Sequence, residues 1–216
     1  MKNPSTQGRM RWGAVALVVS GVFFVLYPAL RPFSDEVSLQ GAAAFASPYW
    51  LVAHMLAMIA FTLLPIGLLG LHGAMTGSKT ERGAYSALVL GILGIGLTLP
   101  FYGGEANGLH AIGQEALRRQ DAGLLSLAAV IRGAPGLYMF TVGLLLLGAS
   151  AIVAAVALWQ AEGLPQWSGV PFAAAMALYI PQFFGTQPLR VAHGVLLAIG
   201  CFWIAAVLWR RGGKGR

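Results

Sequence analysis

Six long apolar stretches fill most of this 216-residue chain and decide the solvent in which it folds. They cover residues 12–30, 49–75, 84–103, 137–160, 168–184 and 188–209. A helix needs about 20 apolar residues to cross the hydrocarbon core of a bilayer, and these stretches reach or approach that length. Because lipid offers no hydrogen bonds to the backbone, only helices or closed barrels can cross it. The sequence therefore predicts an all-α, polytopic membrane protein with six transmembrane helices in one bundle.

The composition agrees with this class. Charged residues make up 10% of the chain and hydrophobic residues 57%, whereas a soluble domain carries about 25% charged residues. The first apolar stretch is followed by five more and lacks a small-residue cleavage pattern, so we interpret it as a span rather than a signal peptide. We expect a single transmembrane helical domain over residues 1–216.

The positive charge is distributed unevenly along the predicted topology. If the N-terminus lies in the cytoplasm, the inner segments hold nine basic residues against two acidic ones, and the outer segments hold five of each. This asymmetry is the positive-inside pattern of membrane proteins. It accounts for the net charge of +7 through anchoring to anionic lipid, without any need for nucleic acid as a partner. The sequence thus predicts a multi-pass protein of the bacterial cytoplasmic membrane with both termini cytoplasmic.

Two shorter helices are expected outside the spans. Ser34 precedes two acidic residues, which is typical of a helix N-cap followed by groups that favour the positive end of the helix dipole. This pattern predicts a short outer surface helix over about 35–46. The long connection between the third and fourth spans contains an apolar run over about 124–131 that is too short to cross a membrane. We interpret that run as an interfacial helix.

The histidines and one acid gather at the outer ends of the spans. His54 lies about six residues inside the second span and His193 about five inside the sixth, while Glu105 and His110 follow the third. Ionisable residues at membrane depth are rare and point to function. We therefore expect an outward-facing site formed by these four residues. Its surroundings are predicted to include Tyr102, Arg190 and Met58.

Three functions remain open for this site, and a transporter is a fourth alternative that no mid-membrane charge supports. The imidazoles of His54, His110 and His193 could ligate a transition metal, or His54 and His193 could hold haem. Alternatively, Glu105 and His110 could act as catalytic acid and base on a lipid or isoprenoid substrate. The third function is that of a non-catalytic subunit in a membrane complex. No metalloprotease, haem-attachment or phosphate-loop motif in the sequence selects among them.

The same residues also have a purely structural interpretation. A histidine close to a membrane interface can simply donate a hydrogen bond to a neighbouring helix. Glu105 could form a loop ion pair with Arg118, Arg119 or Arg190. From the membrane class and the functions left open, we expect three kinds of partner: the lipid bilayer, an apolar small molecule and a membrane-complex partner. The sequence leaves open which cofactor, if any, is bound.

Overall fold

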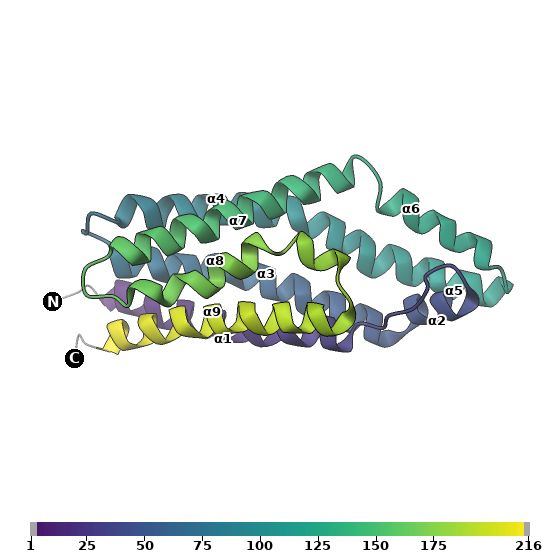
Figure 1. Ribbon diagram of the computed structural model, residues 1–216, viewed down its shortest axis with the longest axis horizontal. Coiled ribbons are helices and arrows are strands. Elements are labelled where there is room, and N and C mark those ends of the chain that lie inside the picture. The colour runs from purple at the N-terminus through teal and green to yellow at the C-terminus, as the bar shows by residue number, and fades with distance from the viewer. Residues whose placement is uncertain (1–3, 214–216) are drawn as a thin grey trace.

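The computed structural model describes residues 4–213, and it places them in a helical bundle without β-strands (Figure 1). Five helices of this range have the length and hydrophobicity needed to cross a membrane. These five are α1 (Pro4–Leu30), α3 (Pro48–Met75), α4 (Glu81–Gly103) with its continuation, α7 (Gly136–Gln160) and α9 (Gln187–Gly213). The prediction of an all-helical, multi-pass membrane protein is therefore confirmed. Helix α1 begins and α9 ends at the same end of the bundle, on the left of Figure 1.

The fifth apolar stretch does not form the continuous spanning helix predicted over 168–184. It folds as the 3-10 turn η3 (Gln166–Gly169), the short helix α8 (Val170–Ala177) and the 3-10 turn η4 (Pro181–Phe184). The helix ends at Ala177 because Pro181, four residues later, has no N–H to donate to the Ala177 carbonyl and its ring would clash with it. The predicted count of six spanning helices is thus not confirmed. We call residues 166–185 the interrupted segment.

The third apolar stretch is longer than predicted. Helix α4 continues through a π-helical turn, η1 (Gly104–Gly108), into α5 (Leu109–Arg119), which makes a helical run of 39 residues. Its far end projects beyond the other spans and packs against α2 (Leu39–Ala46) (Figure 1). The contact is close because Gly113 of α5 lies against α2, where an added Cβ would come within 2.7 Å of the Ala42 carbonyl oxygen.

Helix α2 starts four residues later than the predicted helix over 35–46. The Asp35 carboxylate accepts hydrogen bonds from the Ser38 hydroxyl and from the backbone N–H groups of Val37 and Ser38. These bonds fold residues 35–38 into a turn, and they hold the pKa of the Asp35 carboxyl below its usual value because they stabilise its charged form. Ser38 rather than Ser34 then acts as the N-cap, since its hydroxyl accepts the N–H of Gln40.

The long connection after α5 contains two short helical pieces. They are η2 (Ala122–Ser126) and α6 (Leu127–Ile131), which together include the residues predicted to form a helix over 124–131. Asp121 caps η2 through a hydrogen bond from the N–H of Gly123. The chain then turns back at Arg132 toward α7, so this arm brings Arg132 over the end of the bundle.

Small residues set the distance between α4 and α7. A Cβ added to Gly94 would come within 2.8 Å of the Gly143 carbonyl oxygen and 2.9 Å of Leu147 Cγ, so the two backbones nearly touch. Membrane helices associate largely through such close packing.

Replacing Gly94 by alanine should therefore destabilise the protein by about 1–3 kcal/mol, because the added methyl group has no room. The matched control is Gly96→Ala on the same helix, where nothing lies within 4 Å of the added Cβ. Thermal unfolding in detergent should show a lower midpoint for the first variant and an unchanged or slightly raised one for the second. Equal midpoints in the two variants would contradict the packing assigned to α4 and α7.

Candidate functional site

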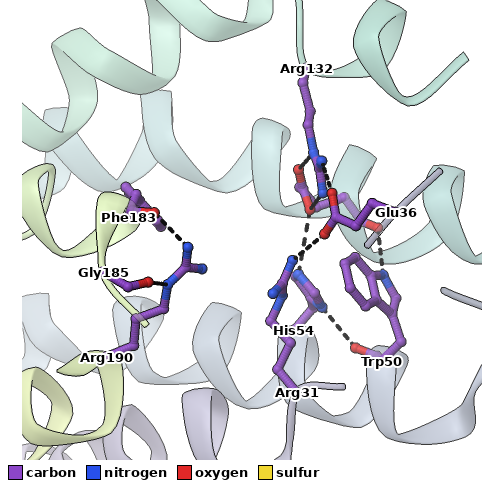
Figure 2. Close-up of polar contacts among 9 residues, drawn as sticks. Arg31, Glu36, Trp50, His54, Arg132, Phe183, Gly185 and Arg190 are labelled. Carbon is purple, nitrogen blue, oxygen red and sulfur yellow. Dashed lines mark hydrogen bonds and ion pairs between the residues drawn. The ribbon is translucent and has the colours of Figure 1, made fainter. Parts of the chain in front are cut away.

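Five ionisable side chains meet at the end of the bundle where α1 ends and α3 begins. Arg31 follows α1, Glu36 lies in the turn before α2, and His54 lies in the second turn of α3. Glu105 comes from the π-helical turn η1, and Arg132 from the connection between α6 and α7. We call these five residues the ionic cluster. Its members come from five different segments, so only the folded chain assembles it (Figure 2).

Arg132 joins the two carboxylates of the ionic cluster. Its Nε and Nη2 donate to the two carboxylate oxygens of Glu105, and its Nη1 donates to Glu36 Oε2 at 2.5 Å. The other oxygen of Glu36 accepts a hydrogen bond from Arg31 at 3.1 Å. Burial alone would lower the pKa of Arg132, but the bonds and charges of Glu105 and Glu36 outweigh it and raise that pKa above its ordinary value. Arg132 is therefore a permanent cation between two anions.

His54 and Trp50 support Glu105 from α3. The His54 Nδ1 must donate its proton to the Trp50 carbonyl oxygen, 2.7 Å away, because a carbonyl can only accept. The His54 Nε2 then faces Glu105 Oε2 at 3.7 Å. The indole N–H of Trp50 donates to the backbone carbonyl of Glu105 at 2.9 Å. A π-helical turn is frequent at functional sites, and here an α3 side chain fixes the turn that carries the carboxylate.

Three buried tyrosines lie beneath the ionic cluster. The hydroxyls of Tyr102 and Tyr179 are 3.1 Å apart, and the ring of Tyr27 contacts the ring of Tyr102. The His54 ring contacts Tyr27 and Tyr102, whereas the His193 ring contacts Tyr179. His54 and His193 therefore contact different members of this tyrosine group.

The structure brings together only part of the predicted site. His54 and Glu105 are neighbours, but His110 on α5 donates from Nδ1 to the Phe45 carbonyl at 2.8 Å and contacts Gln114 through Nε2. His193 donates from Nε2 to the Ala175 carbonyl of α8 at 2.7 Å. Within residues 4–213, no three His, Cys, Asp or Glu side chains are placed so that they could hold one metal ion.

Two side chains of α9 supply donors to the interrupted segment. His193 binds the carbonyl of Ala175, and Arg190 donates to the carbonyls of Gly185 at 3.1 Å and Phe183 at 2.5 Å. A segment without a continuous helix leaves such carbonyls without backbone partners, and in lipid they need others.

The predicted ion pair of Glu105 with Arg118, Arg119 or Arg190 is wrong. Arg118 and Arg119 bind Glu115 instead, and Arg132 binds Glu105.

A cavity of about 660 Å³ lies beside the ionic cluster. All five members of the cluster line it, as do Tyr102 and Arg190, whereas Met58 and His110 do not. Most of its apolar wall comes from α4, α7 and the interrupted segment, namely Phe101, Leu137, Phe140, Leu144, Ile180, Phe183 and Phe184. Leu137 and Phe184 are themselves 42% and 90% exposed, so the cavity opens between α7 and the interrupted segment.

Sequence reasoning missed Arg31, Glu36 and Arg132 as members of the site. The signal was present in the equal numbers of acidic and basic residues in the outer segments, because ion pairing produces such a balance. It does not reveal which residues pair, since Glu36 and Arg132 are 96 positions apart.

The chain matches no protein-family model, no curated protein and no solved structure. Its function is therefore inferred from the ionic cluster and the cavity.

Proposed function

We propose that this multi-pass membrane protein binds a lipid or isoprenoid in the cavity and converts it by acid–base chemistry, in which Glu105 exchanges a proton with the bound molecule. The observation that carries the proposal is a buried carboxylate–imidazole pair, Glu105 and His54, in the wall of a cavity of about 660 Å³. The positive-inside pattern of the sequence would place this cavity toward the outer face of the membrane.

The lining of the cavity supports an amphipathic occupant. Aromatic and aliphatic side chains of α4, α7 and the interrupted segment form one part of the wall, and charged groups form the other. Ligand pockets are typically apolar with a few polar groups that fix orientation, and their volumes are about 300–1,000 Å³. An apolar chain would lie against Phe140 and Leu144, with its polar end at the ionic cluster.

The surroundings of Glu105 support proton exchange. Arg132 keeps this carboxylate ionised, which is the form that accepts a proton, although the two hydrogen bonds from Arg132 also make it a weaker base. The charge of Arg132 is shared with Glu36, which leaves Glu105 less strongly neutralised than in an isolated pair. The His54 Nε2 at 3.7 Å could then take the proton over, because the other ring proton stays on Nδ1, which donates it to the Trp50 carbonyl oxygen.

Ligation of a metal or haem by His54, His110 and His193 has less support. His110 and His193 each bind a backbone carbonyl in a different part of the bundle, and His54 directs its remaining nitrogen toward a carboxylate. The acid–base alternative needs only Glu105 and His54, which the fold brings together.

Filling the cavity should abolish binding. We expect Thr141→Trp on α7 to prevent lipid from remaining bound through purification, as measured by native mass spectrometry of the protein in a neutral detergent. The matched control is Thr62→Trp on α3, since Thr62 is exposed and, like Thr141, only binds the carbonyl four residues earlier. Lipid retained equally by both variants would show that the cavity is not the binding site.

Removing the carboxylate should abolish conversion but preserve binding. We expect purified protein to change the amount of at least one component of a membrane lipid extract, and Glu105→Gln to leave the extract unchanged. The amide oxygen can still accept one of the two hydrogen bonds from Arg132, so this variant should fold. Glu115→Gln on the surface of α5 is the control and should behave as the unmodified protein. Conversion that persists in Glu105→Gln would exclude Glu105 as the proton acceptor.

A further inference from the structure

Arg190 is a cation at the cavity that has no acidic partner. Its Nε and Nη2 donate to the carbonyls of Gly185 and Phe183, and it forms no ion pair with any residue between positions 4 and 213. Arginine has five N–H donors, and two are used here. Figure 2 shows the guanidinium of Arg190 apart from the ionic cluster, and Arg190 lines the same cavity as that cluster. The unused donors therefore remain available at the cavity wall.

The other charges that line the cavity are already satisfied. Glu36 binds Arg31 and Arg132, and Glu105 binds Arg132 and lies beside His54. The Asp35 carboxylate accepts from the turn that precedes α2. Arg190 is half-buried, and a partly desolvated charge is stabilised when it pairs with an opposite charge. Among the charged groups that line the cavity, Arg190 is consequently the one at which an anionic ligand would bind most favourably.

A second guanidinium lies near the same place. Arg31 stacks over the ring of Phe33 at 4.7 Å, and Arg190 lies over that same ring at 5.2 Å. Arg31 is 8% exposed and is held in place by its ion pair with Glu36, so it adds positive potential at this side of the cavity. Arg31 therefore places a second positive charge close to Arg190, and guanidinium groups bind oxyanions through charge-assisted hydrogen bonds.

We infer that the cavity takes an amphiphile with an anionic head group, a phosphate or a carboxylate, and that Arg190 binds this head group beside Arg31. The inference rests on the proposed function and narrows its ligand class. The apolar chain would then extend from the head group along α7 toward Leu137 and Phe184, where the cavity opens.

Four probes can separate the head group from the chain. Dodecyl phosphate and dodecanoate carry both, dodecanol carries only the chain, and inorganic phosphate carries only the head group. We expect the full-length protein in a neutral detergent to bind the two anionic amphiphiles about tenfold or more tightly than dodecanol, because a charge-assisted hydrogen bond contributes that much. Inorganic phosphate should bind more weakly than dodecyl phosphate. Tight binding of inorganic phosphate alone would instead indicate a site for free phosphate.

Arg190→Gln should remove the preference for anions and leave the affinity for dodecanol unchanged. Arg118→Gln is the control, because Arg118 is exposed and pairs with Glu115, and neither residue lines the cavity. Arg190→Gln also weakens the bonds to Gly185 and Phe183, so a second measurement uses the unmodified protein. In it, dodecyl phosphate should protect Arg190 from modification by phenylglyoxal, as mapped by mass spectrometry, and dodecanol should not.

The outcomes distinguish this inference from the proposed function. If the protein binds none of the amphiphiles, both fail. If it binds dodecanol as tightly as dodecyl phosphate, or if Arg190 reacts equally with and without dodecyl phosphate, the anionic head group is wrong while the lipid-binding cavity stands.

Discussion

Replacing Arg132 by leucine should lower the free energy of unfolding by about 3–5 kcal/mol, which is the cost of leaving a buried charge without its partner. Arg132 is the only residue of the ionic cluster that binds both carboxylates, and the Glu105 side chain is only 11% exposed. Its loss leaves Glu105 with His54 alone and releases Glu36 from the arm that contains α6. Chemical or thermal unfolding in detergent measures the change.

A double variant tests whether the loss comes from the orphaned charge. Arg132→Leu combined with Glu105→Gln should recover part of the lost stability, because the buried carboxylate is then gone. Arg119→Leu serves as the surface control, since Arg119 is largely exposed and pairs with Glu115 on the same helix. It should cost less than about 1 kcal/mol. A double variant as unstable as the sum of its parts would refute the coupling between Arg132 and Glu105.

Replacing Trp50 by alanine should cost a similar amount, about 3–5 kcal/mol, which is typical of removing a large buried aromatic side chain. Trp50 is fully buried and contacts the rings of Phe45 and His54 and the guanidinium of Arg31. Its indole also donates the hydrogen bond that fixes the Glu105 carbonyl. The substitution should thus loosen both α2 and the π-helical turn, which unfolding experiments in detergent would detect.

Two companion variants separate packing from hydrogen bonding. Trp50→Phe keeps most of the ring but removes the indole N–H, so it should cost about 1–3 kcal/mol for the unsatisfied carbonyl of Glu105. Tyr49→Ala, one residue earlier and 62% exposed, should have little effect on unfolding. If Trp50→Ala were as mild as Tyr49→Ala, the assigned burial of Trp50 would be wrong.

The hydropathy of the sequence was enough to predict a helical membrane protein, because lipid permits so few backbone structures. It was not enough to predict the interrupted segment. An apolar run of 17 residues reads the same whether it forms one helix or a short helix between turns. Helix α8 ends because Pro181 cannot donate a hydrogen bond to the Ala177 carbonyl. The interrupted segment is stabilised by hydrogen bonds from Arg190 and His193 of α9. Those contacts depend on the tertiary fold.

The candidate site was predictable to a similar degree. His54 and Glu105 stood out because ionisable groups are rare at membrane depth, and the fold does bring them together. His110 satisfied the same criterion, yet its imidazole binds the end of α2 instead. Arg132 looked like an ordinary loop cation. Its role depends on α6 folding back over the bundle, which no periodicity in the sequence indicates.

The hydrogen bonds between Arg190 and the interrupted segment have a consequence for the motions of the protein. The same guanidinium that faces the cavity also holds the carbonyls of Phe183 and Gly185, next to the opening marked by Phe184. Any occupant that draws Arg190 toward itself must therefore compete with these carbonyls. Ligand binding in the cavity is then coupled to the order of η4. A ligand that weakens the hydrogen bonds of Arg190 to Phe183 and Gly185 also makes the residues at the cavity entrance more mobile.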